Sequence, residues 1–242
     1  DAVELIDIEW EALPTVSDST RALSRDATPI HPADPDNLAF EARTGDGEIS
    51  VTTDIEVSAE FRFGRHTGVP LETRAAIADW NPGNETMTVY ASHQTPWQQQ
   101  DVYSQHLGID EHRIRVICPD VGGGFGIKLH VYGDEVTVAA LSKLLGRPVK
   151  FIADRLESFV SDMHSRDHIV VAAAKANTDA IFSMSVDAVG GIGPYSAYRR
   201  VSIGEGMMNI NLTGAPYALK AYDGHFRAAF QNRPTVAMYR AV

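Results

Sequence analysis

Residues 121–128 read VGGGFGIK, a glycine-rich stretch between a predicted strand over 113–121 and a predicted amphipathic helix over 131–145. Consecutive glycines lack Cβ atoms, so the backbone can adopt positive φ angles and a ligand can approach its amides closely. Backbone amides at a helix N-terminus favour an anion or an oxo group. The simpler alternative is that the glycines only allow the strand and the helix to pack tightly.

The glycine-rich stretch departs from two nucleotide-binding motifs. A P-loop requires Ser or Thr directly after its Gly-Lys pair, whereas Lys128 is followed by Leu129. The dinucleotide fingerprint would require a third glycine at position 127, and that residue is an isoleucine. A phosphate-binding module that uses residues 122–126 stays open as an alternative.

The charge balance excludes several classes of protein. The 242 residues include 21 Lys and Arg against 32 Asp and Glu, which gives a net charge of −11. Nucleic-acid binding and polybasic binding to membranes both require a basic surface, so no nucleic-acid partner is expected. No apolar run approaches the roughly 20 residues of a membrane span, so none is expected.

Cys118 is the only cysteine of the sequence. One thiol excludes an internal disulfide, an iron–sulfur cluster and a four-cysteine zinc site within this chain. It suits a reducing compartment, and we expect a cytoplasmic protein. The histidines are scattered without HExxH spacing, so no protein side chains are expected to ligate a metal. Asp134 and Glu135 are expected either on a solvated face or as partners at the end of a strand.

The order of the predicted elements favours an α+β fold with mixed sheets and flanking helices, because strands and helices interleave without a regular βαβ repeat. Alternation of apolar and polar residues predicts strands at 3–9, 49–63, 74–80, 85–92, 113–121, 149–155, 167–176 and 181–189. A turn at 81–84 joins two of them as a hairpin. Helices are predicted at 96–107 and 131–145, ending at Gly108 and Gly146, with a further helix start capped by Ser17 or Asp18. Residues 26–47 are predicted to form an irregular connection, and 195–242 show no clear element.

Three motifs follow one another in a fixed order: SHQT at 92–95, VGGGFGIK at 121–128 and QNRPTVAMYRAV at 231–242. This combination resembles the molybdenum hydroxylases, the xanthine oxidase family. It is most similar to the molybdopterin-binding large subunit shared by xanthine dehydrogenase, aldehyde oxidoreductase and the carbon monoxide dehydrogenase group. The resemblance covers nearly the whole chain. It implies the end of a hammerhead-like domain at 1–25, an irregular linker at 26–47 and the first part of the molybdenum-cofactor-binding domain at 48–242.

The resemblance implies roles for individual residues. Gln94 matches the glutamine that donates a hydrogen bond to the apical oxo ligand of molybdenum, whereas the motif alone would equally fit a surface glutamine. Gly124, Phe125 and Gly126 match the loop that lies against the metal and its dithiolene. Arg240 matches the catalytic arginine beside the substrate, where a guanidinium can neutralise developing oxyanion charge. The alternative for Arg240 is a structural arginine paired with a carboxylate.

Two departures from the family pattern narrow the range of expected substrates. Leu129 stands where xanthine-oxidising members have a glutamate that binds the purine, so a purine substrate is not expected. Ala241 stands where carbon monoxide dehydrogenases have the cysteine that holds copper. Cys118 cannot replace that cysteine because it precedes the glycine-rich stretch.

The resemblance also implies a reaction, cofactors and partners. Family members hydroxylate a C–H carbon of an aldehyde or N-heterocycle with oxygen from water. The cofactor would be a molybdenum pyranopterin dithiolene, with the cytosine dinucleotide form as one alternative. Electrons would pass to a [2Fe–2S] small subunit and an FAD-binding medium subunit. The glutamate base and most dithiolene contacts would lie beyond residue 242, in the remainder of the large subunit, so we expect the chain alone to be inactive. A non-catalytic scaffold or assembly piece of such a complex is the alternative function.

Overall fold

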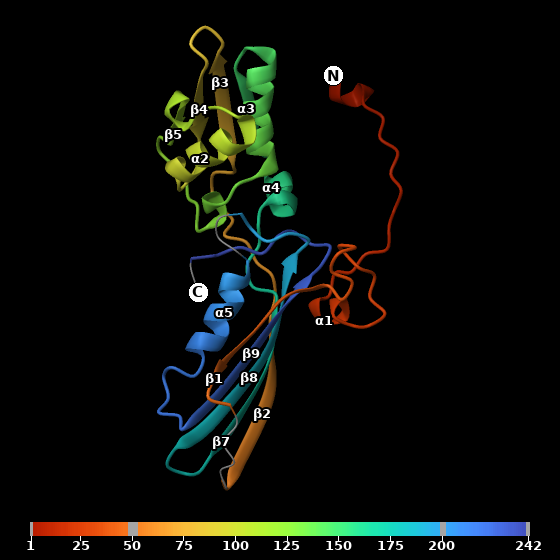
Figure 1. The fold of residues 1–242 in the computed structure, drawn as a ribbon, viewed down its shortest axis with the longest axis vertical. Coiled ribbons are helices and arrows are strands. Elements are labelled where there is room, and N and C mark those ends of the chain that lie inside the picture. Colours follow the sequence, from red (N-terminus) through yellow and green to blue (C-terminus); the bar gives the residue numbers. More distant parts are fainter. Residues whose placement is uncertain (1, 48–52, 199–201, 241–242) are drawn as a thin grey trace.

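Two β-sheets lie one beyond the other along the long axis of the computed structural model, which describes residues 2–47, 53–198 and 202–240 (Figure 1). The strands of the larger sheet are, in spatial order, β1 (Leu38–Gly45), β9 (Ala221–Phe230), β8 (Ile181–Gly193), β7 (His168–Ala176) and β2 (Ile55–Phe63). β8 and β9 pair in parallel, and the other neighbours are antiparallel. The predicted α+β class with mixed sheets is confirmed.

Helix α5 (Ile203–Leu212) covers one face of the larger sheet (Figure 1). Its Ile210 is buried against Phe226 of β9 together with Val186 of β8. A Cβ atom on Gly206 would overlap the Phe226 ring, so a glycine allows this close approach of helix and sheet.

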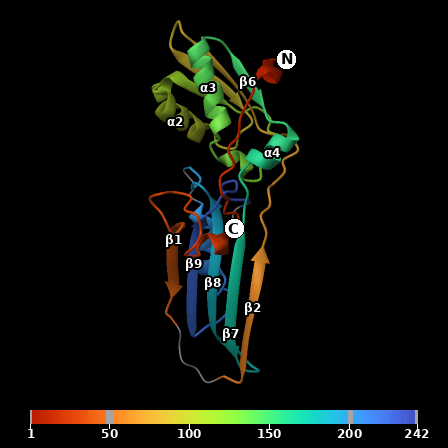
Figure 2. The same ribbon diagram turned by 90° about the vertical axis from the view of Figure 1, so that its right-hand side faces the viewer.

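The smaller sheet contains β5 (Ile114–Ile117), β4 (Thr86–Ala91), β3 (Ala75–Asn81) and β6 (Val149–Ile152) in spatial order. Helices α2 (Pro96–Leu107) and α3 (Gly133–Leu145) pack on one face (Figure 2), around a core that includes Met87, Val89 and Tyr103. Both helices end as predicted, because Gly108 and Gly146 adopt left-handed φ angles of 61° and 62°. The hairpin between β3 and β4 is confirmed as well.

Several predicted boundaries near the N-terminus are wrong. Residues 3–9 form no strand: a 3₁₀ turn, η1 (Ala2–Leu5), is followed by an irregular exposed arm, because their alternating pattern has no partner strand among the described residues. The short helix α1 (Ser19–Ala22) is capped by Asp18, as predicted. The expected irregular connection at 26–47 instead contains β1, whose pairing with β9 joins residues far apart in the sequence. The domain boundaries themselves stay a prediction.

Other differences lie downstream. The strand predicted at 113–121 is shorter in the structure. It begins at Ile114, directly after the 3₁₀ turn η2 (Glu111–Arg113), and ends at Ile117. The strand predicted at 149–155 ends at Ile152, because Asp154 and Glu157 form a capping box that begins α4 (Arg155–Ser161). The C-terminal region, predicted to lack clear elements, supplies α5 and β9. Part of the strand predicted at 49–63 lies outside the described residues, and β2 begins at Ile55.

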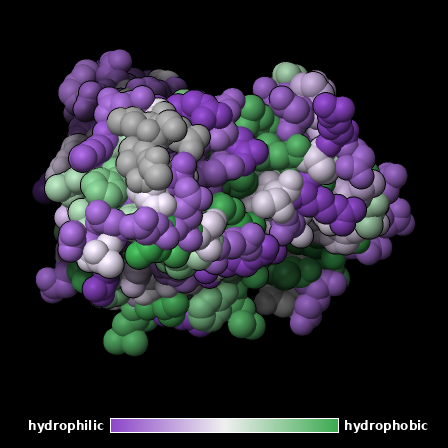
Figure 3. All heavy atoms as spheres, turned by 90° about the horizontal axis from the view of Figure 1, so that it is seen from below, coloured by the Kyte–Doolittle hydropathy of each residue, from purple (hydrophilic) through white to green (hydrophobic). Residues whose placement is uncertain are grey.

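Apolar side chains are exposed at the edge of the larger sheet. Strand β2 lies at the edge of this sheet (Figure 2). Every residue of β2 is exposed, including Val57, Phe61 and Phe63. The space-filling view from below shows apolar patches among hydrophilic side chains (Figure 3). Among the described helices, none has the length and apolar character needed to cross a lipid bilayer.

Candidate functional site

The glycine loop, residues 121–126, follows β5 and leads into a single 3₁₀ turn, η3 (Ile127–Leu129). Helix α3 begins only at Gly133, so the expectation that the loop forms the N-terminus of a helix is wrong. The macrodipole of α3 therefore does not act on the loop amides, since that effect falls off within the first turn.

Three glycines of the loop pack against three different segments. A Cβ atom on Gly122 would lie 2.5 Å from Cβ of Glu72, and one on Gly124 would collide with the Gln94 amide. Gly126 has a φ of 100° and a Cβ there would collide with the Met238 carbonyl. The loop is therefore the place where segments around residues 72, 94 and 238 meet, rather than a simple strand-to-helix packing turn.

Gln94 lies at the surface with its side-chain amide fixed by the loop. Its Oε1 accepts a hydrogen bond from Gly126 N at 3.1 Å, and the main-chain N–H of Gln94 donates to the Lys128 carbonyl at 2.8 Å. Because Oε1 takes the acceptor position, Nε2 is left as a donor with no acceptor among the described residues. The neighbouring Gln98 and Gln99 instead donate to groups of the protein, namely the Leu129 carbonyl and the Glu135 carboxylate.

Phe125 and Arg240 lie together on the same surface. Both have left-handed backbones, with φ angles of 55° and 52°. Arg240 N donates to the Phe125 carbonyl at 3.1 Å, and the guanidinium carbon lies 4.8 Å from the centre of the Phe125 ring. Among the described residues, no carboxylate forms an ion pair with Arg240.

The segment that carries Arg240 is held between the two sheets by main-chain contacts. Val236 N donates to the Ile192 carbonyl at 3.0 Å, and Ala237 N donates to the His164 carbonyl at 2.7 Å. The Ser165 hydroxyl donates to the Ala237 carbonyl at 2.6 Å. These contacts fix the register of the segment, so that Arg240 meets Phe125.

A buried polar cluster supports the loop from below. The Arg74 side chain is 1% exposed and donates to the Asp134 and Asp162 carboxylates at 2.6–2.7 Å. Its guanidinium carbon lies 3.7 Å from the centre of the Tyr132 ring, and the Tyr132 hydroxyl donates to the Ile127 carbonyl at 2.9 Å. The cluster thus connects β3, α3 and α4 to the turn that follows the glycine loop.

Glu135 and His93 belong to the same cluster. Burial raises the pKa of Glu135 to about 7, against the opposing effect of Arg74. Burial lowers the pKa of His93 to about 4. The Gln99 amide lies between them, 3.0 Å from Glu135 and 2.7 Å from His93. The expectation that Asp134 and Glu135 form a solvated face is wrong, because Glu135 is only 2% exposed. The alternative, that they are partners at the end of a strand, agrees with their ion pairs to Arg74, which directly precedes β3.

The sequence predicted no role for Glu72, although it lies at the loop. Its carboxylate accepts hydrogen bonds from Gly122 N and from the fully buried Lys128 ammonium. Lys128 therefore points inward and cannot contact a ligand at the loop surface. Gly122 N and Gly126 N also have acceptors within the protein, which disfavours a phosphate-binding module at 122–126.

The remaining donors of the loop fit a group with several acceptor atoms. Among the described residues, nothing accepts a hydrogen bond from the N–H groups of Gly123, Gly124 and Phe125. Together with Gln94 Nε2 they offer uncharged donors to oxo or sulfur ligands of an anionic centre. In the part of the chain that the structure describes, no three His, Cys, Asp or Glu side chains gather as a metal site.

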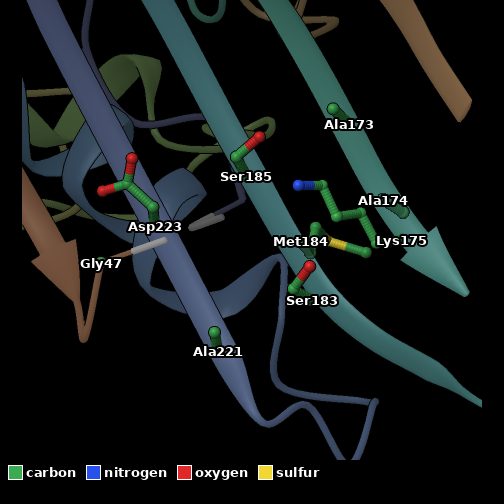
Figure 4. A pocket seen from close by; sticks show the side chains of 9 residues that line it. All are labelled: Gly47, Ala173, Ala174, Lys175, Ser183, Met184, Ser185, Ala221 and Asp223. Atoms are coloured by element: carbon green, nitrogen blue, oxygen red, sulfur yellow. The ribbon is translucent and has the colours of Figure 1, made fainter. Parts of the chain in front are cut away.

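A separate pocket lies toward the other end of the larger sheet. It is lined by residues of β7, β8 and β9, with Ser183 and Ser185 on one face of β8 and Asp223 on β9 (Figure 4). About 25 Å of strand, at roughly 3.3 Å a residue, separates Ser183 from Gly191 near the Arg240 segment. The pocket is therefore distinct from the candidate site.

Comparison with known proteins places this geometry in a family. The molybdopterin cofactor-binding domain family matches residues 30–242. The chain is 33% identical over 183 residues to the nicotine 6-hydroxylase large subunit of Paenarthrobacter nicotinovorans, which covers 74% of this chain and 22% of the relative. It is 31% identical over 214 residues to the carbon monoxide dehydrogenase large chain of Hydrogenophaga pseudoflava, covering 81% of this chain and 27% of the relative.

The structural comparison agrees. Quinoline 2-oxidoreductase from Pseudomonas putida 86 superposes with a TM-score of 0.90 at 26% identity, over 99% of this chain and 31% of that one. The chain thus spans less than a third of the length of each of these three proteins. The resemblance to the molybdenum hydroxylase large subunit is confirmed, and the chain belongs to the molybdopterin cofactor-binding domain family.

Proposed function

We propose that the chain forms one wall of a molybdenum-pyranopterin site in an oxidoreductase that hydroxylates a C–H carbon of an aldehyde or N-heterocycle with oxygen from water. The observation that supports this most directly is the outward Nε2 of Gln94 beside the unpaired amides of Gly123, Gly124 and Phe125. When bound, the cofactor supplies the oxygen transfer and accepts the electron pair.

The residues of this chain bind and orient. Gln94 Nε2 donates to an oxo group of the cofactor, and its Oε1 stays on Gly126. Gly124 and Gly126 carry no Cβ atoms, so the Phe125 backbone and ring would be able to lie against the cofactor. Arg240 is the catalytic residue: its guanidinium has no carboxylate partner among the described residues, so its charge is available to a substrate that develops negative charge.

The substrate lies outside the purines in this proposal. Leu129 follows the glycine loop, and an uncharged side chain there offers no acceptor for a purine ring. Ala241, which lies outside the described residues, provides no thiolate for copper. An aldehyde or an N-heteroaromatic compound fits both departures.

The proposal requires further protein. We propose that the remainder of the large subunit supplies the glutamate base and most contacts to the dithiolene. A [2Fe–2S] small subunit and an FAD-binding medium subunit receive the electrons. The cofactor is a molybdenum pyranopterin dithiolene, for which the cytosine dinucleotide form is one alternative, and the complex is cytoplasmic. The nicotine 6-hydroxylase relative is named as a large subunit, which supports the presence of partner subunits.

The experiment is co-expression of the chain with its genomic neighbours, followed by elemental analysis for molybdenum and a fluorescence assay for oxidised pterin. We expect one molybdenum and one pterin per copy of the chain in the complex, and neither in the chain purified alone. A complex that assembles without molybdenum would favour the scaffold alternative. Stoichiometric molybdenum in the isolated chain would contradict the requirement for further protein.

A further inference from the structure

Glu72 and Lys128 form an ion pair beneath the glycine loop. The Lys128 side chain is 0% exposed, and its Nζ donates to Glu72 Oε2 at 2.7 Å and to Ser92 Oγ at 2.6 Å. The Ser92 hydroxyl in turn donates to the same oxygen of Glu72. The three side chains come from the 65–74 segment, the end of β4 and the 3₁₀ turn after the loop, so they join three separate segments.

The same glutamate holds the start of the loop. Glu72 Oε2 accepts from Gly122 N at 2.8 Å, and Glu72 N donates to the Gly122 carbonyl at 3.1 Å. Both main-chain groups of Gly122 are therefore bound to one residue. Because Lys128 follows the loop, the Glu72 carboxylate ties its two ends together.

The buried charge of Lys128 requires the Glu72 carboxylate as its partner. A buried ammonium is costly unless an anion faces it, so Lys128 needs Glu72 in order to stay inside. Although partial burial alone would raise the pKa of Glu72, hydrogen bonds from Lys128, Ser92 and Gly122 N lower it below its usual range. The carboxylate is thus anionic when it holds the loop.

The pair also acts on Gln94. Ser92 lies two residues before Gln94, and Gln94 N donates to the Lys128 carbonyl at 2.8 Å. The backbone of Lys128 thus holds Gln94 while its side chain holds Glu72. Through these bonds the amide of Gln94 and the free N–H groups of residues 123–125 keep fixed relative positions.

We propose that Glu72 is a positioning residue: with Lys128 it forms a clamp that preorganises the glycine loop and Gln94 for the cofactor. The clamp's effect on the loop stands on its own, and its purpose toward the cofactor rests on the proposed function. Preorganised donors lose less conformational freedom when a ligand binds, so loosening the clamp weakens retention of the ligand.

The first experiment measures amide hydrogen exchange of the cofactor-free chain. In Glu72→Gln, peptides covering 121–129 exchange roughly ten- to a hundredfold faster, the range for loss of a hydrogen bond to a charged group. In Lys128→Met the effect is smaller, because Glu72 still accepts from Gly122 N and Ser92. The double variant exchanges more slowly than Glu72→Gln, because it removes the unpaired buried cation.

The control is Glu60→Gln, which breaks an exposed ion pair with Arg62 of 2.7 Å and leaves 121–129 unchanged. Peptides from 96–107 report global stability. Unchanged loop exchange in Glu72→Gln overturns the proposal, and so does equal acceleration in 96–107. If Glu72→Gln fails to fold, the exchange of peptides 121–129 is compared with that of 96–107 in Lys128→Met and in the double variant instead.

The second experiment measures molybdenum retained by the co-expressed complex after dialysis. Glu72→Gln retains severalfold less than the wild type, and Glu60→Gln retains as much. Faster loop exchange with unchanged molybdenum retention overturns the positioning role. A wild-type complex without molybdenum would contradict the proposed function and, with it, the clamp's purpose toward the cofactor, whereas the exchange data would still decide whether the clamp holds the loop.

Discussion

The Arg240 backbone N–H donates to the Phe125 carbonyl at 3.1 Å, and the Arg240 guanidinium lies against the Phe125 ring. The two residues are 115 positions apart, and both have a left-handed backbone conformation. The pair brings a charged side chain to the edge of the glycine loop.

Replacement of Arg240 tests the planar cation directly. Arg240→Lys keeps the charge but loses the planar guanidinium and its contact with Phe125. In the assembled oxidoreductase we expect kcat/KM to fall about ten- to a hundredfold, in the range of losing one preorganised charged donor. Arg113→Lys, in an exposed ion pair with Glu85, serves as the matched control. Equal kinetics for the two variants would remove Arg240 from the catalytic surface.

Replacement of Gly124 tests the packing of the loop on Gln94. In Gly124→Ala the new methyl group collides with the Gln94 amide, so either the loop or Gln94 must move. We expect a loss of about 1–3 kcal/mol in the free energy of unfolding, measured by urea titration. The control is Gly133→Ala, since a Cβ atom there meets nothing within 4 Å. Its stability should be unchanged or slightly increased. Equal losses in both variants would contradict the close approach of Gln94.

Replacement of Glu135 tests its burial through pH. The folded-state pKa of Glu135 is raised from 4.5 to about 7, so the folded chain holds a proton that the unfolded chain releases. The resulting stabilisation is complete below pH 4.5 and is lost as the pH rises to about 7. Between pH 4.5 and about 7, the free energy of unfolding of the wild type should fall by up to about 1.4 kcal/mol per pH unit relative to that of Glu135→Gln.

The measurement is the free energy of urea unfolding across that window, with Glu60→Gln as the exposed control. Parallel curves for the wild type and Glu135→Gln would mean that Glu135 is ionised beside Arg74 throughout. That outcome would assign the polar cluster a fully charged ground state instead.

Replacement of His168 tests a pH dependence of stability that runs in the opposite direction to that of Glu135. Burial lowers the pKa of His168 from 6.5 to about 4, so the folded chain keeps this ring neutral while the unfolded chain takes up a proton. Its contribution is complete above pH 6.5 and is lost as the pH falls toward 4. In His168→Gln the unfolding free energy should decline less steeply over that range, by up to about 1.4 kcal/mol per pH unit. His112→Gln, at an exposed position, should follow the wild type.

Local signals predicted the smaller sheet well. Gly108 and Gly146 ended their helices, and the turn at 81–84 formed its hairpin, because each signal acts within a few residues. The larger sheet was harder to predict, because β1 pairs with β9 across most of the chain. Helix α5 was missed for a related reason: Gly206 lowers helix propensity locally but is needed under the Phe226 ring.

In the candidate site, too, residues within local motifs were predicted and residues that depend on distant partners were not. The motifs identified Gln94, Phe125 and Arg240, and the loop brings all three to one surface. Glu72 was not predicted, because its partner Lys128 is 56 positions away and neither residue has a local signature. The position of Lys128 after the glycines suggests a residue that faces a ligand, as the lysine of a phosphate-binding motif does. Its burial depends on a carboxylate from another segment.

The crossover through α5 between the parallel strands β8 and β9 sets the order in which this protein can fold. The segment that carries Arg240 follows β9 directly, so we expect it to reach the glycine loop after the larger sheet has formed. Closing contacts between distant residues costs chain entropy before any bond forms, which makes such contacts slow to form. The smaller sheet, with Gln94 and the loop, can form earlier. We therefore expect the Arg240–Phe125 contact to form late in folding, once both sheets are complete.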